Sequence, residues 1–321
     1  MISRRLLRIK ALMALYALNR RDDNDLVQAE KELLFSISRT YDLYHYVLLL
    51  IIELADIASD RIDLALKKNV PTFEDLNPNR RFADNLIITQ LRNNIDLNNY
   101  VTEKKISWVN SRDITRTIFN KMLLWESFTE YMSAPKSSYS IDKKFITSLV
   151  TEFFVASEDL LSGLEEQSIF WNDDLEYVSA MIDKTLRKFK AENESQNKLM
   201  PLYKNEDDEQ YVKTLFRKAV LRTKECSEMI DRNTTNWEVE RIALMDILVM
   251  QLAITEIVEF QEIPVKVTLN EYIEIAKYYC TSKSSTFVNG ILDNIVREMR
   301  DNGTFKKSGR GLIGELEKDE E

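Results

Sequence analysis

Residues 264–293 read PVKVTLNEYIEIAKYYCTSKSSTFVNGILD, a pattern typical of two helices joined by a short turn. Pro264 has no backbone N–H to donate, so it ends one element and can open the next. Thr268 and Glu271 have the spacing of a capping box, which predicts that the first helix begins near Thr268. Ser284 or Ser285 is a candidate N-cap for the second helix.

The second helix carries an apolar stripe at helical spacing. Its members are Phe287, Val288, Ile291, Leu292, Ile295 and Met299. Gly290 interrupts the stripe, at a position where glycine costs about 1 kcal/mol relative to alanine. We therefore expect another backbone to approach Gly290 closely, and we predict that the two helices pack against each other.

The composition favours an all-α fold with a substantial core. The chain has 321 residues, of which 44% are hydrophobic, with 6 glycines and 5 prolines. A sheet protein of this length needs many more turn residues. No glycine-rich phosphate loop is present, His45 lies in a long apolar segment, and Cys226 and Cys280 have no metal-ligand spacing. We expect a structural histidine, no metal and no cofactor.

The charge distribution points to one local basic site on an acidic protein. The net charge of −9 argues against binding nucleic acid over the whole surface. Residues 1–21, however, carry six basic side chains and no acid, an arrangement that can hold phosphate at one place. Charges interrupt the apolar positions of residues 1–21, so this segment does not read as a signal peptide. The apolar run 46–55 is too short to span a membrane. We expect a reduced, cytoplasmic chain.

Periodicity predicts about ten helices, with the polar stretch 191–207 as the clearest linker. The predicted helices cover residues 3–18, 29–66, 82–103, 107–133, 140–168, 173–190, 208–233, 238–260, 268–280 and 285–301.

Three segments resemble the NusB family of bacterial transcription antitermination factors. Residues 264–293 are similar to the family's P-x-K-V-x-I-N-E-A-I-E-L-A-K and F-V-N-G-V-L-D. Residues 4–16, RRLLRIKALMALY, are similar to R-R-x-x-R-x-x-A-x-Q-A-L-Y. Trp237, Arg241 and Asp246 match W-x-x-x-R-x-x-x-x-D. The chain looks like the long versions of the family from Bacteroidetes-like bacteria.

The resemblance implies a NusB-like helical bundle enlarged by an additional helical region of about five helices. It divides the chain into a basic N-terminal helix (1–21), a helical insertion without a counterpart in short members (22–200) and a C-terminal helical core (201–302). The last residues, 303–321, are expected to be a disordered tail.

The function that the resemblance implies is that of an RNA-binding adaptor, not an enzyme. NusB proteins bind the boxA element of nascent ribosomal RNA leaders together with NusE, a small-subunit ribosomal protein, and act on RNA polymerase to suppress termination. One alternative is the helical domain of an RNA cytosine methyltransferase, but the glycine-rich cofactor loop of such enzymes is missing here. A second alternative is a protein-interaction scaffold that has lost RNA binding. A homodimer is open as well.

Arg4, Arg5 and Arg8 match the family's arginine motif and share one side of the first predicted helix. Guanidinium groups bind phosphate bidentately and stack on unpaired bases, so the match implies RNA contact, with a solvated helix start as the alternative. Leu6 and Leu7 depart from the more basic or polar residues of many members. This departure implies either a weaker RNA affinity or a share of the RNA contacts in the insertion.

The other RNA-binding candidates are Tyr16, Phe287 and Lys277, for which core packing or solvation is the alternative. Asp246 and Tyr16 match family positions on the NusE side. The carboxylate of Asp246 would suit an interface with a basic ribosomal protein.

Overall fold

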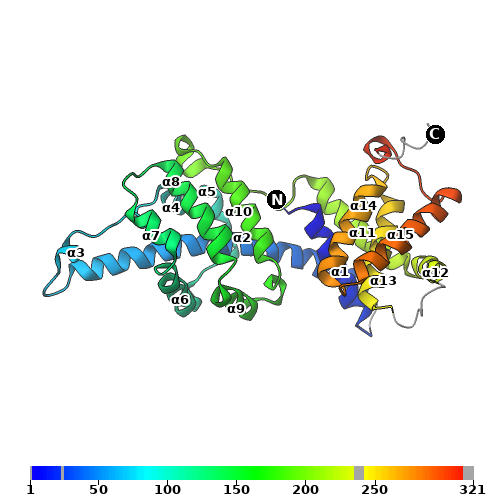
Figure 1. Ribbon diagram of the computed structural model, residues 1–321, viewed down its shortest axis with the longest axis horizontal. Helices are drawn as coiled ribbons and strands as arrows, with labels where there is room; N and C mark the ends of the chain where they lie inside the picture. Colours follow the sequence, from blue (N-terminus) through cyan, green and yellow to red (C-terminus); the bar gives the residue numbers. More distant parts are fainter. Residues whose placement is uncertain (1, 23–24, 235–241, 314–321) are drawn as a thin grey trace. The chain divides into compact units, whose positions relative to one another are not determined.

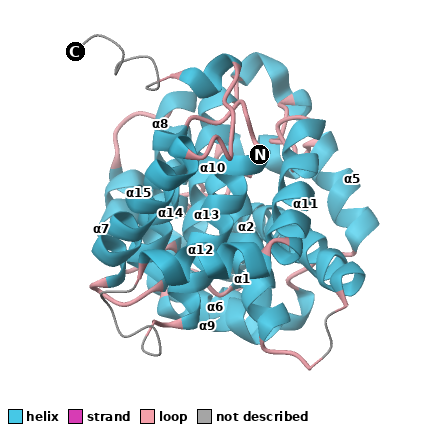
Figure 2. Ribbon diagram, turned by 90° about the vertical axis from the view of Figure 1, so that its right-hand side faces the viewer, coloured by secondary structure: helices cyan, strands magenta, loops and turns pink. Residues whose placement is uncertain are grey.

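The computed structural model describes residues 2–22, 25–234 and 242–313, and every regular element in these residues is a helix (Figure 1, Figure 2). The predicted all-α class is confirmed. The chain forms two compact units, which we call the terminal unit (residues 2–37 and 203–321) and the central unit (38–202). The long helix α2 (Leu26–Leu66) contributes residues to both. No helix of the described residues is long and apolar enough to cross a membrane.

The terminal unit is built around one helix that is apolar on all sides. Helix α13 packs against five others, and a helix that is hydrophobic all round belongs in a core. The helices of this unit besides α2 are α1 (Arg4–Asn19), α11 (Glu206–Leu221), α12 (Thr223–Asn233), α13 (Leu244–Glu259), α14 (Val265–Tyr279) and α15 (Ser284–Asp301).

Helix α14 begins directly after Pro264, so the capping-box prediction is wrong. Proline suits a helix start, because the N–H it lacks would have no partner inside the helix. Thr268 is therefore one turn inside α14, where its hydroxyl is buried and donates to Oε1 of Glu256 at 2.8 Å. Glu271 instead pairs with Arg5 from α1.

Helix α15 has the predicted apolar stripe, with Val288, Ile291 and Leu292 among its buried residues and Phe287 half-buried. The expected close approach at Gly290 is wrong, because a Cβ added there would meet no atom within 4 Å. Gly311 has the close approach instead, since a Cβ on it would lie 1.8 Å from the backbone oxygen of Gln261.

The central unit contains more helices than the periodicity predicted, because three predicted helices are each broken. Two of the breaks occur where a short polar side chain caps the next helix, as Asn94 does for Leu97 N–H and Ser157 for Leu160 N–H, whereas α7 begins after Trp125 without a side-chain cap. The helices besides α2 are α3 (Phe73–Leu76), α4 (Leu86–Arg92), α5 (Ile95–Lys104), α6 (Arg112–Met122), α7 (Glu126–Ser133), α8 (Tyr139–Ser148), α9 (Glu158–Gln167) and α10 (Leu175–Lys188), with a π-helical turn at Leu149–Phe154.

His45 has the structural role predicted for it. Its ring is buried and stacks on Tyr100 at 3.8 Å between centroids, and its Nδ1 lies 2.9 Å from the carbonyl oxygen of Tyr41. Burial lowers the pKa of His45 to about 4, because the charged imidazolium would lose its hydration. The ring is therefore neutral near pH 7.

The segment that follows α15 is described as far as Ile313. Lys307 donates to the carbonyl oxygens of Ile257 (2.8 Å) and Phe260 (3.0 Å), and Gly309–Leu312 form a 3₁₀ turn. These contacts satisfy carbonyls at the end of α13 that the helix itself leaves free. Residues 314–321 lie outside the described residues.

Candidate nucleic-acid interface

The three arginines of the N-terminal motif project from the first turns of α1. Ser3 begins this helix by accepting a hydrogen bond from the N–H of Leu6. Leu6 and Leu7 face the core, with 1% and 0% of their surfaces exposed. They therefore occupy positions that no RNA ligand could reach, and they leave the neighbouring arginines to face other partners.

Arg8 is buried in a bidentate ion pair with Glu256 of α13. Its Nε donates to Oε2 at 2.7 Å and its second nitrogen to Oε1 at 2.8 Å, with 4% and 0% of the two side chains exposed. Burial is the largest single effect on the pKa of Arg8 and lowers it. The hydrogen bond to Glu256, together with the charge interactions with Glu256 and two tyrosines, outweighs burial and holds this pKa above its usual range. Arg8 has no open face for RNA in this arrangement.

Glu256 is the centre of a buried polar network within the apolar α13. Besides Arg8, its carboxylate accepts hydrogen bonds from the hydroxyls of Tyr211 (2.5 Å), Thr268 (2.8 Å) and Tyr272 (3.3 Å). Burial raises the pKa of both tyrosines well above the usual value, with the Glu256 charge as the next cause. A fully bonded carboxylate of this kind makes a buried ion pair tolerable and fixes the packing of the helices that supply its donors.

Arg5 and Arg4 are also ion-paired, but both stay accessible. Arg5 makes two hydrogen bonds to Glu271 of α14 (2.9 and 2.8 Å), and Arg4 donates to Asp208 of α11 at 2.9 Å. The arginine side chains are 42% and 43% exposed. The bond from Arg5 is the largest cause that lowers the pKa of Glu271. The arginine motif thus docks α1 onto α11, α13 and α14, and two of its three members still face solvent.

Two further candidates lie at the turn between α14 and α15. Lys277 is in the last turn of α14, 52% exposed and 2.5 Å from Glu274, and the half-buried Phe287 is in the first turn of α15. Lys277 lies six residues after Glu271, about 9 Å along the helix from the partner of Arg5.

The remaining two candidates occupy different places. Tyr16 is half-buried under the guanidinium of Arg20, 5.2 Å from its ring centroid. It lies eleven residues, about 17 Å of helix, from Arg5. The structure therefore does not bring Tyr16 together with the exposed arginines.

Asp246 is buried at the start of α13, with 6% of its surface exposed. Its Oδ2 accepts from Ser284 Oγ at 3.0 Å, while Oδ1 has no hydrogen-bond partner among the described residues. Burial, followed by a hydrogen bond to Asp246, raises the pKa of Cys280 to about 12. Asp246 thus ties the start of α13 to the α14–α15 turn. Trp237 and Arg241, the other members of its motif, lie outside the described residues.

Sequence reasoning missed the acidic partners of the arginines, above all Glu256. The available signal was the single carboxylate of Glu256 within residues 248–257 (LVMQLAITEI), a run that is otherwise almost entirely apolar. A charge in such a run needs a buried partner, and the cationic segment at the N-terminus offered one.

Comparison with known proteins settles the family. The NusB family pattern matches residues 175–297. The NusB transcription antitermination protein of Salinibacter ruber is 42% identical over 115 residues, which are 36% of this chain and 72% of that protein. The chain belongs to the NusB family. No solved structure matches it.

Two further NusB relatives match shorter stretches. The NusB protein of Chloroherpeton thalassium is 40% identical over 103 residues, 32% of this chain and 49% of that protein. That of Natranaerobius thermophilus is 34% identical over 95 residues, 30% of this chain and 68% of that protein. The NusB family pattern begins at residue 175, so it takes in α10 of the central unit as well as α11–α15.

Proposed function

We propose that this NusB-family chain is a non-enzymatic, cytoplasmic transcription antitermination factor. In this proposal it recognises the boxA element of nascent ribosomal RNA leaders together with NusE and promotes antitermination by RNA polymerase. The observation that carries the proposal is the similarity to relatives that are named transcription antitermination proteins, at 42% and 40% identity.

We assign the RNA contacts first to Arg4 and Arg5, because their side chains combine positive charge with exposure above 40%. Both sit in the first turn of α1, where the helix dipole adds favourable potential for phosphate. Lys277 and Phe287 supply a further cation and a ring at the α14–α15 turn. Arg8 acts indirectly, since its pair with Glu256 holds α1 in place.

For the protein partner we propose the surface around Tyr16, with Asp246 in a supporting role. Tyr16 and Arg20 present a stacked ring and cation at the C-terminal end of α1. Asp246 supports the α14–α15 turn from inside. We also propose that the NusB-like core is interrupted by the helical insertion predicted at residues 22–200. The compact units divide near these ends, at residues 38 and 202, although the family pattern already begins at residue 175.

A charge reversal at Arg5 tests the RNA assignment. Arg5→Glu removes an exposed cation and one exposed ion pair, and Arg232→Glu is the matched control because it breaks the similarly exposed pair with Glu298. We expect Arg5→Glu to weaken boxA RNA binding by about tenfold or more and to lower the slope of log affinity against log salt by about 1 or more. Equal affinities of the two variants would overturn the assignment.

The scaffold alternative is favoured by one observation, the net charge of −9. It predicts no salt-dependent affinity for boxA RNA in the wild-type chain, measured by fluorescence anisotropy between about 50 and 200 mM salt.

A further inference from the structure

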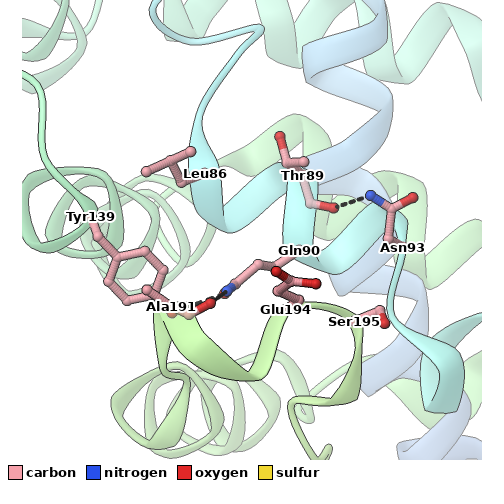
Figure 3. Close-up of a pocket in the computed structure, with 8 residues that line it drawn as sticks. All are labelled: Leu86, Thr89, Gln90, Asn93, Tyr139, Ala191, Glu194 and Ser195. Carbon is pink, nitrogen blue, oxygen red and sulfur yellow. Dashed lines mark hydrogen bonds between the residues drawn. The ribbon is translucent and has the colours of Figure 1, made fainter.

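The central unit contains an open pocket of about 450 Å³ between α4, the start of α8 and the turn that follows α10 (Figure 3). This volume lies in the range of small-molecule sites, about 300–1,000 Å³. The pocket is lined by Leu86, Thr89, Gln90, Asn93, Tyr139, Ala191, Glu194 and Ser195.

Hydrogen bonds hold the pocket walls together. Gln90 donates from Nε2 to the carbonyl oxygens of Lys190 (3.0 Å) and Ala191 (3.3 Å), and its Oε1 accepts from the hydroxyl of Tyr139 at 2.8 Å. The buried Asn197 closes the turn by bonding to both the N–H and the carbonyl of Lys190. Three separate segments are therefore fixed around the opening.

Glu194 sits in this turn with a strained backbone. Its φ of 44° and ψ of −119° lie in a region that glycine adopts freely and that costs another residue about 1–3 kcal/mol. Figure 3 shows its side chain rising from the turn toward α4, among the other lining residues. Strain of this kind is typical of positions where a side chain serves a ligand.

Two acceptors remain free in the pocket, beside the hydroxyl of Ser195. The carboxylate of Glu194 has no ion pair among the described residues. Asn93 uses its Nδ2 to donate to the carbonyl of Thr89 (3.1 Å), which leaves its Oδ1 available. A ligand with hydrogen-bond donors suits these two acceptors.

The rim of the pocket carries three lysines, of which Lys190 lies 3.8 Å from Glu192. Lys143 lies 5.4 Å from the centroid of the Tyr139 ring and donates to the carbonyl of Phe189 at 2.8 Å. Lys136 precedes Tyr139 by three residues, Lys190 adjoins the lining turn, and both side chains are exposed. Lysines on the rim and acceptors inside suit a ligand that carries phosphates next to an amino group.

We propose that this pocket binds one amino-bearing base (adenine, cytosine or guanine) of single-stranded RNA. Glu194 accepts hydrogen bonds from the base, Tyr139 offers its ring for stacking, and Lys136, Lys143 and Lys190 hold the flanking phosphates. This second RNA site rests on the proposed RNA-binding function, and it gives the central unit a part in that function.

The test is the base preference of the full chain. Fluorescence anisotropy with labelled 12-residue oligo(A), oligo(C) and oligo(U) should show binding of the first two about tenfold tighter than that of oligo(U), whose base has no amino group and only an N3–H between two carbonyl oxygens that repel a carboxylate. Glu194→Gln should reduce the preference to about twofold or less, because an amide donates as well as accepts. Glu192→Gln, with the same charge change on the same turn, should retain it.

A second variant separates binding from folding. Glu194→Gly removes the acceptor and relieves the backbone strain, so it should lose the preference without a lower Tm. No preference in the wild type, or equal behaviour of Glu194→Gln and Glu192→Gln, overturns the inference. Binding of an oligo-lysine peptide that Glu194→Gln abolishes would also overturn it, in favour of a peptide site.

Binding of boxA RNA by the same samples distinguishes the two proposals. If the wild type binds boxA RNA but shows no base preference through Glu194, this inference alone fails. If the wild type binds no RNA, the proposed function fails with it.

Discussion

The pair of Arg8 and Glu256 allows a sharp prediction about what the arginine motif does. Both side chains are at most 4% exposed, so removal of either partner leaves a charge in the core. Breaking such a pair costs about 3–5 kcal/mol. Glu256→Leu should lie at the upper end, because it leaves the buried Arg8 cation with only a 3.5 Å contact to Glu271 and also removes the acceptor of three hydroxyls. Arg8→Met should lie at the lower end, because those hydroxyls still stabilise the carboxylate.

The double variant tests whether the two substitutions are coupled, and in which direction. Arg8→Met with Glu256→Leu removes both charges and fills the space with apolar side chains. It should therefore be more stable than Glu256→Leu alone, even though it contains one more substitution. The two single effects must then sum to more than the double effect, a coupling that independent sites do not show.

Hydrogen exchange in a urea series, read by mass spectrometry on separate peptides, is the appropriate assay because the two units need not unfold together. Peptides from α1 and α13 should lose protection in the single variants, and peptides from α8 in the central unit serve as the internal control. A cost of less than about 1 kcal/mol for Glu256→Leu, or a double variant no more stable than Glu256→Leu, would show that the pair does not dock α1 onto α13.

Three further predictions concern stability. Because the pKa of His45 is lowered to about 4 in the fold, its contribution of up to about 3 kcal/mol is complete above pH 6.5 and is lost as the pH falls toward 4. In urea unfolding, the free energy of unfolding of His45→Phe should therefore depend less on pH than that of the wild type. Gly290→Ala should raise the free energy of unfolding by about 0.5–1 kcal/mol, whereas Gly311→Ala should release the 3₁₀ turn and its amide protection, because its Cβ collides with a backbone carbonyl. Thr268→Val should cost about 1–3 kcal/mol through the lost bond to Glu256, and an effect under about 0.5 kcal/mol would favour a surface cap instead.

The sequence predicted the helical class well because apolar periodicity and scarce glycine and proline act over long windows. The α14–α15 pair was foreseen from residues 264–293, and the structure places both helices within a few residues of the predicted ends. Helix breaks were missed at Asn94 and Ser157, where one capping side chain outweighs a continuing apolar pattern.

Site chemistry was harder to predict because it depends on contacts between distant segments. Arg8 and Glu256 are separated by 248 residues, and nothing local marks them as partners. A cationic motif therefore suggested an RNA surface where the structure shows, for Arg8, a core ion pair. Thr268 and Gly290 were misjudged for the same reason, since a hydroxyl or a glycine obtains its role from the element that packs against it.

The most direct measurement of the central claim is binding of the full chain to a boxA-containing RNA, with and without the small-subunit ribosomal protein NusE, across a salt series. We expect an affinity that depends on the boxA sequence, increases when NusE is present and falls steeply with salt. A folded, helical chain that binds boxA and scrambled RNA equally, or binds neither in either condition, would contradict it.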